Sequence, residues 1–358
     1  MISLVTQSSY TVSVYAADAA RPAAAATSAA ASTAKPAQTT AAATATATPA
    51  ATTPAKPAEA MDPAFAATLN KGIELFNKSK YQEAMAEFQK AMELDKKGLN
   101  TSVRNWMGAC YQRLNNHKDA AALYEEVVKL DPDYAEAHNN LAFSYQQLQN
   151  YEGSEAEYKK ALALKAGFLE ARFNLACVLQ LENKNDEALS EFETVLKMDP
   201  TKSDCFLHIG DIAKETKDFD KAMEFYNKAL ALNKKDPAVL CKIALIYKEK
   251  GDPGKCKDEL EKVLDLDPGS YDALLNMGIM QYEAKDFSAC LDYLAKALER
   301  NPYDAAVHFW LGRYYFSLDS LKNSIKQFSD CLKCDAVEHK FPECQEWLDK
   351  AKAKQATF

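Results

Sequence analysis

A period of 34 residues constrains this chain more than any other feature of its sequence. Glycine or alanine recurs first after 36 residues and then at six successive steps of 34. The series consists of Gly72, Gly108, Ala142, Ala176, Gly210, Ala244, Gly278 and Gly312. Self-similarity at a fixed period is typical of repeat proteins, in which each unit buries its apolar face against its neighbours.

Each unit reads as two helices separated by a break. In one unit, Leu141 and Tyr145 share a face of a first helix, and Ser154, Tyr158 and Ala161 share a face of a second. The second helices repeat a small residue followed four positions later by a large one. The large residues are Phe88, Tyr124, Tyr158, Phe192, Tyr226, Leu260, Leu294 and Phe328. A small residue on one helix facing a large residue on the other lets the pair cross closely.

Asp131-Pro132, Asp199-Pro200, Asp267-Pro268 and Asn301-Pro302 close four of the units, and proline cannot continue a helix. This pattern resembles the tetratricopeptide repeat (TPR) family. The resemblance implies an all-α, right-handed α-solenoid of eight helix-turn-helix units within residues 61–338. The units begin near 65, 101, 135, 169, 203, 237, 271 and 305.

The two ends of the chain are expected to differ from the repeats. Residues 339–358 carry an apolar face that predicts a capping helix: Phe341, Cys344, Trp347, Leu348 and Ala351. Residues 17–60 are rich in Ala, Thr and Pro, and this composition predicts a disordered linker. Residues 1–16 resemble a degenerate or truncated signal segment without a basic start. The chain is therefore periplasmic or secreted if that segment is a shortened signal peptide, and cytoplasmic otherwise.

Composition limits the function further. The formal net charge of −8 disfavours a nucleic-acid partner, which usually meets a basic surface. No apolar run approaches the roughly 18 residues of a membrane span. With 11 glycines in 358 residues, a glycine-rich phosphate-binding enzyme is disfavoured, and no cofactor is expected.

The TPR resemblance implies that a peptide or partner protein binds in a concave groove lined by the first helices. Two rows of residues are candidates for this surface. The first row is Asn70, Trp106, Asn140, Asn174, His208, Lys242, Asn276 and Trp310. The second row is Phe76, Gln112, Gln146, Gln180, Lys214, Lys248, Tyr282 and Phe316.

Amides offer both a donor and an acceptor to a peptide backbone, and lysines can accept an acidic group. The predicted partner-binding residues are Asn105, Asn139, Asn140, Gln146, Asn174, Gln180, Lys214, Lys248 and Asn276. A solvated polar face is the alternative interpretation for any one of these residues.

Cys331, Cys334, His339 and Cys344 have the ligand spacing of a zinc knuckle. A metal turn there lacks flexible glycines, because Asp335 and Glu338 occupy those places, and Cys331 already fits the helix pattern. The nine cysteines of the chain are scattered in a way that does not resemble a disulfide framework.

The sequence thus favours a non-catalytic protein-interaction scaffold, not an enzyme, and allows self-association through the ends of the array. Two alternatives stay open. One is a module that recruits substrates for an enzyme acting in trans. The other is a zinc-dependent nucleic-acid binder at the carboxyl-terminal cysteines.

Overall fold

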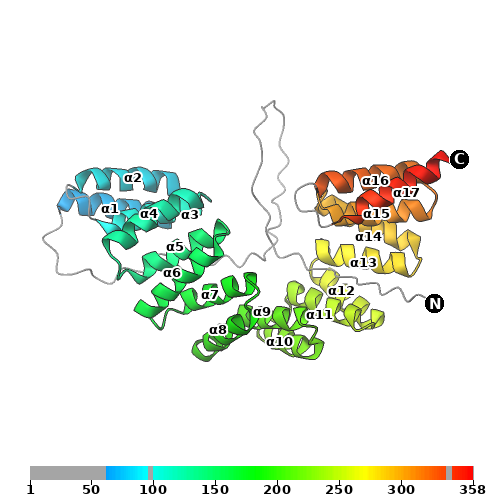
Figure 1. Cartoon of the computed structure of the whole chain (residues 1–358), viewed down its shortest axis with the longest axis horizontal. Helices are drawn as coiled ribbons and strands as arrows, with labels where there is room; N and C mark the ends of the chain where they lie inside the picture. Colours follow the sequence, from blue (N-terminus) through cyan, green and yellow to red (C-terminus); the bar gives the residue numbers. More distant parts are fainter. Residues whose placement is uncertain (1–61, 96–99, 336–340, 358) are drawn as a thin grey trace. The chain divides into compact units, whose positions relative to one another are not determined.

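The computed structural model describes residues 62–95, 100–335 and 341–357. These residues form seventeen α-helices and no β-strand (Figure 1). The helices of the first four units are α1 (Pro63–Asn77), α2 (Tyr81–Leu94), α3 (Thr101–Arg113), α4 (His117–Leu130), α5 (Ala135–Gln147), α6 (Tyr151–Leu164), α7 (Leu169–Leu181) and α8 (Asn185–Met198). The remaining helices are α9 (Ser203–Glu215), α10 (Phe219–Leu232), α11 (Pro237–Glu249), α12 (Pro253–Leu266), α13 (Tyr271–Glu283), α14 (Phe287–Arg300), α15 (Ala305–Ser317), α16 (Leu321–Cys334) and α17 (Glu343–Ala356).

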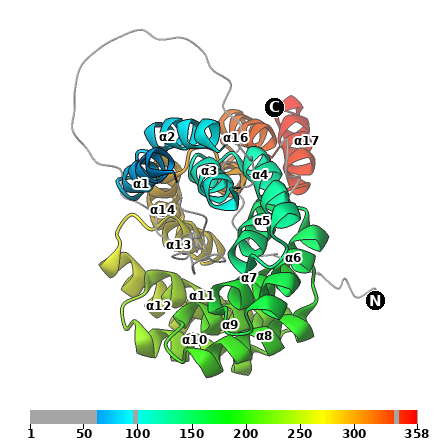
Figure 2. The same cartoon turned by 90° about the vertical axis from the view of Figure 1, so that its left-hand side faces the viewer.

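Neighbouring helices pack in sequence order. Each odd-numbered helix pairs with the even-numbered helix that follows it, and that even helix also packs against the next odd helix. Figures 1 and 2 show this succession from α1 to α17 from two directions. The eight predicted helix pairs are therefore confirmed, and the expectations for residues 1–60 lie outside the described residues.

Where the small residue of a first helix is glycine, the large residue opposite leaves no room for a side chain. A Cβ atom added to Gly108 would lie 2.7 Å from the ring of Tyr124, and one added to Gly312 would lie 2.6 Å from the ring of Phe328. Both rings are fully buried, so neither can move away into solvent. This close fit of small against large residues explains why the 34-residue period appears so clearly in the sequence.

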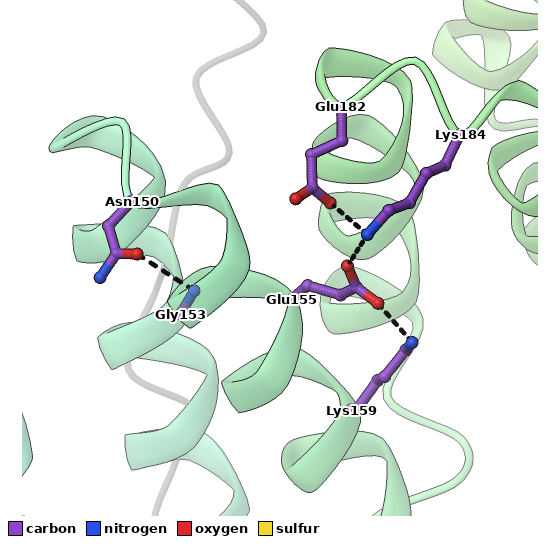
Figure 3. Close-up of polar contacts among 6 residues, drawn as sticks. All are labelled: Asn150, Gly153, Glu155, Lys159, Glu182 and Lys184. Atoms are coloured by element: carbon purple, nitrogen blue, oxygen red, sulfur yellow. Dashed lines mark hydrogen bonds and ion pairs between the residues drawn. The ribbon is translucent and has the colours of Figure 1, made fainter.

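A short turn closes each helix pair. In seven units a residue other than glycine has a φ near +60° just after the odd helix, and in the unit of α11 and α12 Gly251 takes this place with a φ of 73°. The backbone N–H of the next residue then donates a hydrogen bond to a carbonyl in the last turn of the odd helix. Asn150 N, for example, donates to Tyr145 O at 2.9 Å. Asn150 also caps α6, because its Oδ1 accepts a hydrogen bond from Gly153 N at 3.1 Å (Figure 3).

The last helix closes the apolar end of the array. The expected cap forms as α17, with Cys344, Leu348 and Ala351 buried against α16. Cys331 of α16 and Cys344 are joined by a disulfide, with their Cα atoms 6.4 Å apart. The other seven cysteines are free.

Candidate functional site

The two rows of candidate residues meet at the joints between successive units. A second-row side chain of one unit contacts the first-row residue of the next, as the rings of Phe76 and Trp106 do at 5.2 Å. Gln112 Nε2 donates to the backbone oxygen of Asn140 at 2.9 Å, and Tyr282 packs on Trp310 at 5.5 Å. The cap continues the series, because Phe316 packs on Trp347 at 5.3 Å. These residues therefore hold odd helices together as well as forming the candidate surface.

Asparagines form a buried network across α3 and α5. Asn105, Asn139 and Asn140 are each only 2–3% exposed. Asn140 Nδ2 donates to Asn105 Oδ1 at 3.2 Å, and Asn139 Nδ2 lies 3.4 Å from Asn140 Oδ1. The network connects to the second row, since Gln112 Nε2 also donates to Ser144 Oγ at 2.9 Å. Their predicted role in partner binding stays a prediction, but these side chains also pack within the fold.

Several buried polar atoms beside this network have no hydrogen-bond partner among the described residues. They are Asn139 Oδ1, Glu170 Oε1 and Asn174 Nδ2. We call Asn139, Gln146, Glu170 and Asn174 the amide segment. Gln146 lies beside it because its Oε1 accepts a hydrogen bond from Tyr158 OH at 3.3 Å, and Asn174 is close to the same hydroxyl without meeting hydrogen-bond geometry. The segment combines unsatisfied acceptors with an unsatisfied donor.

Sequence reasoning missed Glu170. It stands four residues before Asn174 on α7, and that helical spacing was the available signal. Burial raises the pKa of its carboxyl to about 7, against the lowering effect of the nearby positive charges of Lys202 and Arg113. At neutral pH the carboxyl thus exists in both forms, and it can accept or donate a hydrogen bond.

One of the three lysines in the middle of the array is already paired within the chain, and the predicted role of Lys214 and Lys248 in partner binding stays a prediction. Lys242 Nζ already binds Asp211, at 2.7 and 2.9 Å from its two carboxylate oxygens, and Tyr226 OH donates to the same carboxylate. Lys214 and Lys248 have no ion pair within the described ranges and are half-buried. Burial, followed by the charge of Lys242, lowers the pKa of Lys214.

Gln180 and Asn276 already have partners within the chain. Gln180 Oε1 lies 2.8 Å from Nδ1 of His208, whose ring stacks on Phe192. Burial lowers the pKa of His208, which favours the neutral imidazole. Asn276 Nδ2 donates to Asp272 O on its own helix at 2.8 Å.

The cysteines do not form a visible metal site. Cys331 and Cys344 are bonded to each other, Cys334 is free and half-buried, and His339 lies outside the described residues. Among the described residues, no group of three or more Cys, His, Asp or Glu side chains is placed to hold a metal ion. Burial raises the pKa of the Cys110 and Cys205 thiols to about 12, so both are protonated at neutral pH.

No helix in the described part of the chain is both long and apolar enough to cross a bilayer.

Family models agree with this geometry. A model described as TPR repeat matches residues 108–149, and three described as tetratricopeptide repeat match residues 67–97, 135–168, 179–245, 237–270 and 272–302. With the paired helices and the small-against-large fit, these matches place the chain in the tetratricopeptide repeat family. None of the curated proteins matches the chain.

Solved structures show the same fold at low sequence identity. A chain of the APC/C hetero-tetramer Cut9–Hcn1 is 19% identical with a TM-score of 0.55; the match covers 79% of this chain and 55% of that one. A tetratricopeptide repeat protein from Parabacteroides merdae is 14% identical with a TM-score of 0.55, covering 81% and 100% of the two chains. PilF of Pseudomonas aeruginosa is 18% identical with a TM-score of 0.51, covering 62% and 97%. The chain thus spans about half the length of the Cut9–Hcn1 chain, and these likenesses concern the fold alone.

Proposed function

We propose that this chain is a non-catalytic scaffold that binds an extended peptide of a partner protein through the amide segment. The TPR fold is one that typically serves protein–protein interaction. Within it, the amide segment offers a surface that is polar, uncharged at most positions and carried by helices fixed in the array. Such a surface suits recognition of a peptide backbone.

The observation that carries this proposal is the set of unsatisfied atoms on Asn139 and Asn174. Both side chains are at least 97% buried, since only 2% and 3% of their surface is exposed. A buried polar atom without a partner costs about 1–3 kcal/mol, so such atoms need a specific explanation. Because both atoms are closed to solvent in the unbound chain, peptide binding requires the two side chains to turn outward, where a backbone N–H meets Asn139 Oδ1 and a C=O meets Asn174 Nδ2.

This mode of recognition depends weakly on the partner's sequence. Each amide pairs with backbone groups that every residue except proline presents in full. Specificity then has to come from side chains on either side of the amide segment. Glu170 adds one such element, because its ionised form favours a nearby basic group and its neutral form can donate a hydrogen bond.

The test uses the full chain and a peptide selected on it from a random displayed library. The double variant Asn139→Ala with Asn174→Ala should lower the affinity for the selected peptide by roughly tenfold or more, because two hydrogen-bonding groups are lost. Asn140 is kept, since it holds Asn105 across the joint between α3 and α5. Anisotropy of the labelled peptide measures the affinity.

A matched control changes two exposed asparagines, Asn227→Ala and Asn323→Ala, on the even helices α10 and α16. This control should bind the peptide as the unaltered chain does. Unchanged affinity in the Asn139 and Asn174 double variant, with its helicity and melting intact, would show that the amide segment is not the site.

A further inference from the structure

A single arginine is enclosed by aromatic rings at the carboxyl-terminal end of the array. The guanidinium carbon of Arg313 lies 4.3 Å from the ring centre of Trp347 and 5.5 Å from that of Trp310. Tyr282 and Phe309 lie at 5.4 and 5.8 Å. We call Arg313 and these four rings the arginine cage.

Three successive odd helices build the cage. Tyr282 comes from α13, Phe309, Trp310 and Arg313 come from α15, and Trp347 comes from the cap α17. Edge-to-face ring contacts fix the walls, with Tyr282 against Trp310 at 5.5 Å and Phe309 against Trp310 at 5.6 Å. Arg313 itself is only half-buried, so the cage is open on one side. The rings hold the guanidinium in one orientation before any ligand arrives.

The charge of Arg313 is not balanced by an acid of the described chain. Its Nε is buried without a hydrogen-bond acceptor, and no carboxylate lies within ion-pair distance of it in the described ranges. Lys350, which lies over the cage ring of Trp347, pairs with Glu346. Lys354, over the neighbouring ring of Phe316, pairs with Asp319. The guanidinium of Arg313 is therefore held in one orientation among apolar rings, and no acid of the described residues forms an ion pair with it.

We propose that the arginine cage binds an aspartate or glutamate side chain of a partner peptide, with an apolar residue of the same peptide packed on the surrounding rings. A guanidinium recognises a carboxylate through two parallel hydrogen bonds, and low exposure strengthens them. The aromatic walls supply apolar contact area beside that charge pair. One unpaired charge, rather than a basic stripe, fits one acidic residue and not a nucleic-acid backbone.

The inference extends the proposed scaffold function to a second contact and names its chemistry. It does not depend on the amide segment, which lies on α5 and α7. A peptide bound at both places would meet a backbone-reading surface at one end and a charge-specific one at the other. The two contacts can therefore be tested separately.

The probes are two capped tripeptides, Ac-Phe-Glu-Leu-NH2 and Ac-Phe-Gln-Leu-NH2, titrated into the full chain carrying Trp106→Phe. The remaining tryptophans, Trp310 and Trp347, then report on the cage by fluorescence. We expect the glutamate peptide to bind roughly tenfold more tightly than the glutamine peptide, because only a carboxylate pairs with the guanidinium charge. Arg313→Gln should remove this difference, and Arg313→Lys should keep only part of it.

Lys350→Gln is the matched control, because Lys350 also lies over Trp347 but is already paired with Glu346. It should leave the preference for glutamate unchanged. Equal binding of both peptides, no response to the glutamate peptide up to about 10 mM, or unchanged preference in Arg313→Gln would overturn the inference. Glutamate preference retained in the Asn139 and Asn174 double variant would show that the cage acts independently of the amide segment.

Discussion

The joint between α3 and α5 and the joint between α13 and α15 occupy equivalent places in the repeat but differ in chemistry. In the first, Gln112 reaches the next unit through hydrogen bonds to Asn140 O and Ser144 Oγ, both 2.9 Å long. In the second, Tyr282 reaches the next unit through a ring contact with Trp310 at 5.5 Å. The period fixes the backbone geometry of each joint, while the residue at the joint decides what the surface can recognise.

A third kind of contact between successive units, in the middle of the array, extends this comparison. There the joint between α9 and α11 is an ion pair, Asp211 with Lys242, backed by Tyr226 OH. One scaffold thus carries amide, ionic and aromatic joints in succession. Hydrogen-bonded joints require exact partners, whereas ring contacts bury more apolar area, so the cost of breaking them should differ.

Trp310→Ala should destabilise the chain most. Its ring is 6% exposed and contacts Tyr282, Phe309 and Arg313, and removing a buried Trp costs about 3–5 kcal/mol. Denaturant unfolding followed by far-ultraviolet circular dichroism measures the loss. Tyr303→Ala, in a turn where the ring is 82% exposed, is the control and should change little. A loss below about 1 kcal/mol for Trp310→Ala would mean that the aromatic joint is dispensable.

Reducing the Cys331–Cys344 disulfide should lower the free energy of unfolding somewhat less than Trp310→Ala does. A loop of this size, with the two cysteines 13 residues apart, contributes about 3 kcal/mol by restricting the unfolded chain. Melting with and without reductant measures the effect. The double variant Cys331→Ala with Cys344→Ala should melt at the same temperature under both conditions. If reductant shifts this variant as much as the unaltered chain, the effect comes from another cysteine.

Gln112→Ala tests the amide joint directly. It removes the bonds to Asn140 O and Ser144 Oγ and leaves the hydroxyl of buried Tyr124 without the acceptor that now lies at 3.0 Å. We expect a loss of about 1–3 kcal/mol in the free energy of unfolding. Gln147→Ala, at an exposed position of α5, is the matched control. A loss as large as that of Trp310→Ala would remove the contrast between the two kinds of joint.

The fold could be predicted from the sequence because its constraints repeat. The fit of Gly108 on Tyr124 recurs in register as Gly312 on Phe328. The eight units differ in many residues, but together they show a clear pattern. The odd helices from α3 on begin where that pattern places the unit starts. Local propensity and packing agree at nearly every unit, which is the condition for reliable prediction.

The candidate site was less predictable because it depends on pairings that no period encodes. Lys242 belongs to the first candidate row, but the row did not indicate that Asp211 of the preceding unit pairs with it. Nothing in the spacing showed that the ring of Trp347 would close over Arg313, or that Glu170 would lie unpaired beside Asn174. Such contacts depend on side-chain reach between units, which the sequence pattern does not specify.

A pair of equivalent histidines sharpens the comparison through pH. His138 of α5 and His308 of α15 both approach a proline carbonyl with Nε2, at 2.9 and 3.1 Å. Their Nδ1 atoms face different partners: a Glu157 carboxylate at 2.6 Å and the Gln327 amide at 2.7 Å. Both acceptors of His138 require an N–H, which favours the imidazolium, whereas the Gln327 amide facing His308 can either donate or accept a hydrogen bond.

Burial is the largest influence on the pKa of His138 and lowers it, but the bonds to Glu157 and Pro132 O together outweigh burial and raise the pKa. The stabilisation is therefore complete below the unfolded pKa of about 6.5 and is lost as pH rises through the folded pKa. We expect Glu157→Gln to flatten the fall in melting temperature above that pH. An unchanged profile in Glu157→Gln would show that the carboxylate does not hold the proton on His138.

The smallest effect should come from the surface ion pairs that also cross a joint. Lys184 Nζ reaches Glu155 of the preceding unit at 2.6 Å and Glu182 at 3.1 Å, and Lys159 binds Glu155 from the same helix (Figure 3). These bonds, first to Lys159 and then to Lys184, lower the pKa of Glu155 to about 2. Because Lys184 is 40% exposed, water and salt screen the pair, and Lys184→Gln should destabilise the chain less than Gln112→Ala does.

The sign of the pH effect of Lys184→Gln is opposite to that of the histidine. A lowered carboxyl pKa stabilises the fold above the unfolded value of about 4.3, and this contribution is lost as pH falls toward 2. The difference between Lys184→Gln and the unaltered chain should therefore shrink in acid and in high salt. Lys197→Gln on α8, at an exposed position, serves as control. If the loss of stability in Lys184→Gln persists in high salt, the ion pair is not screened by solvent and contributes as the buried joints do.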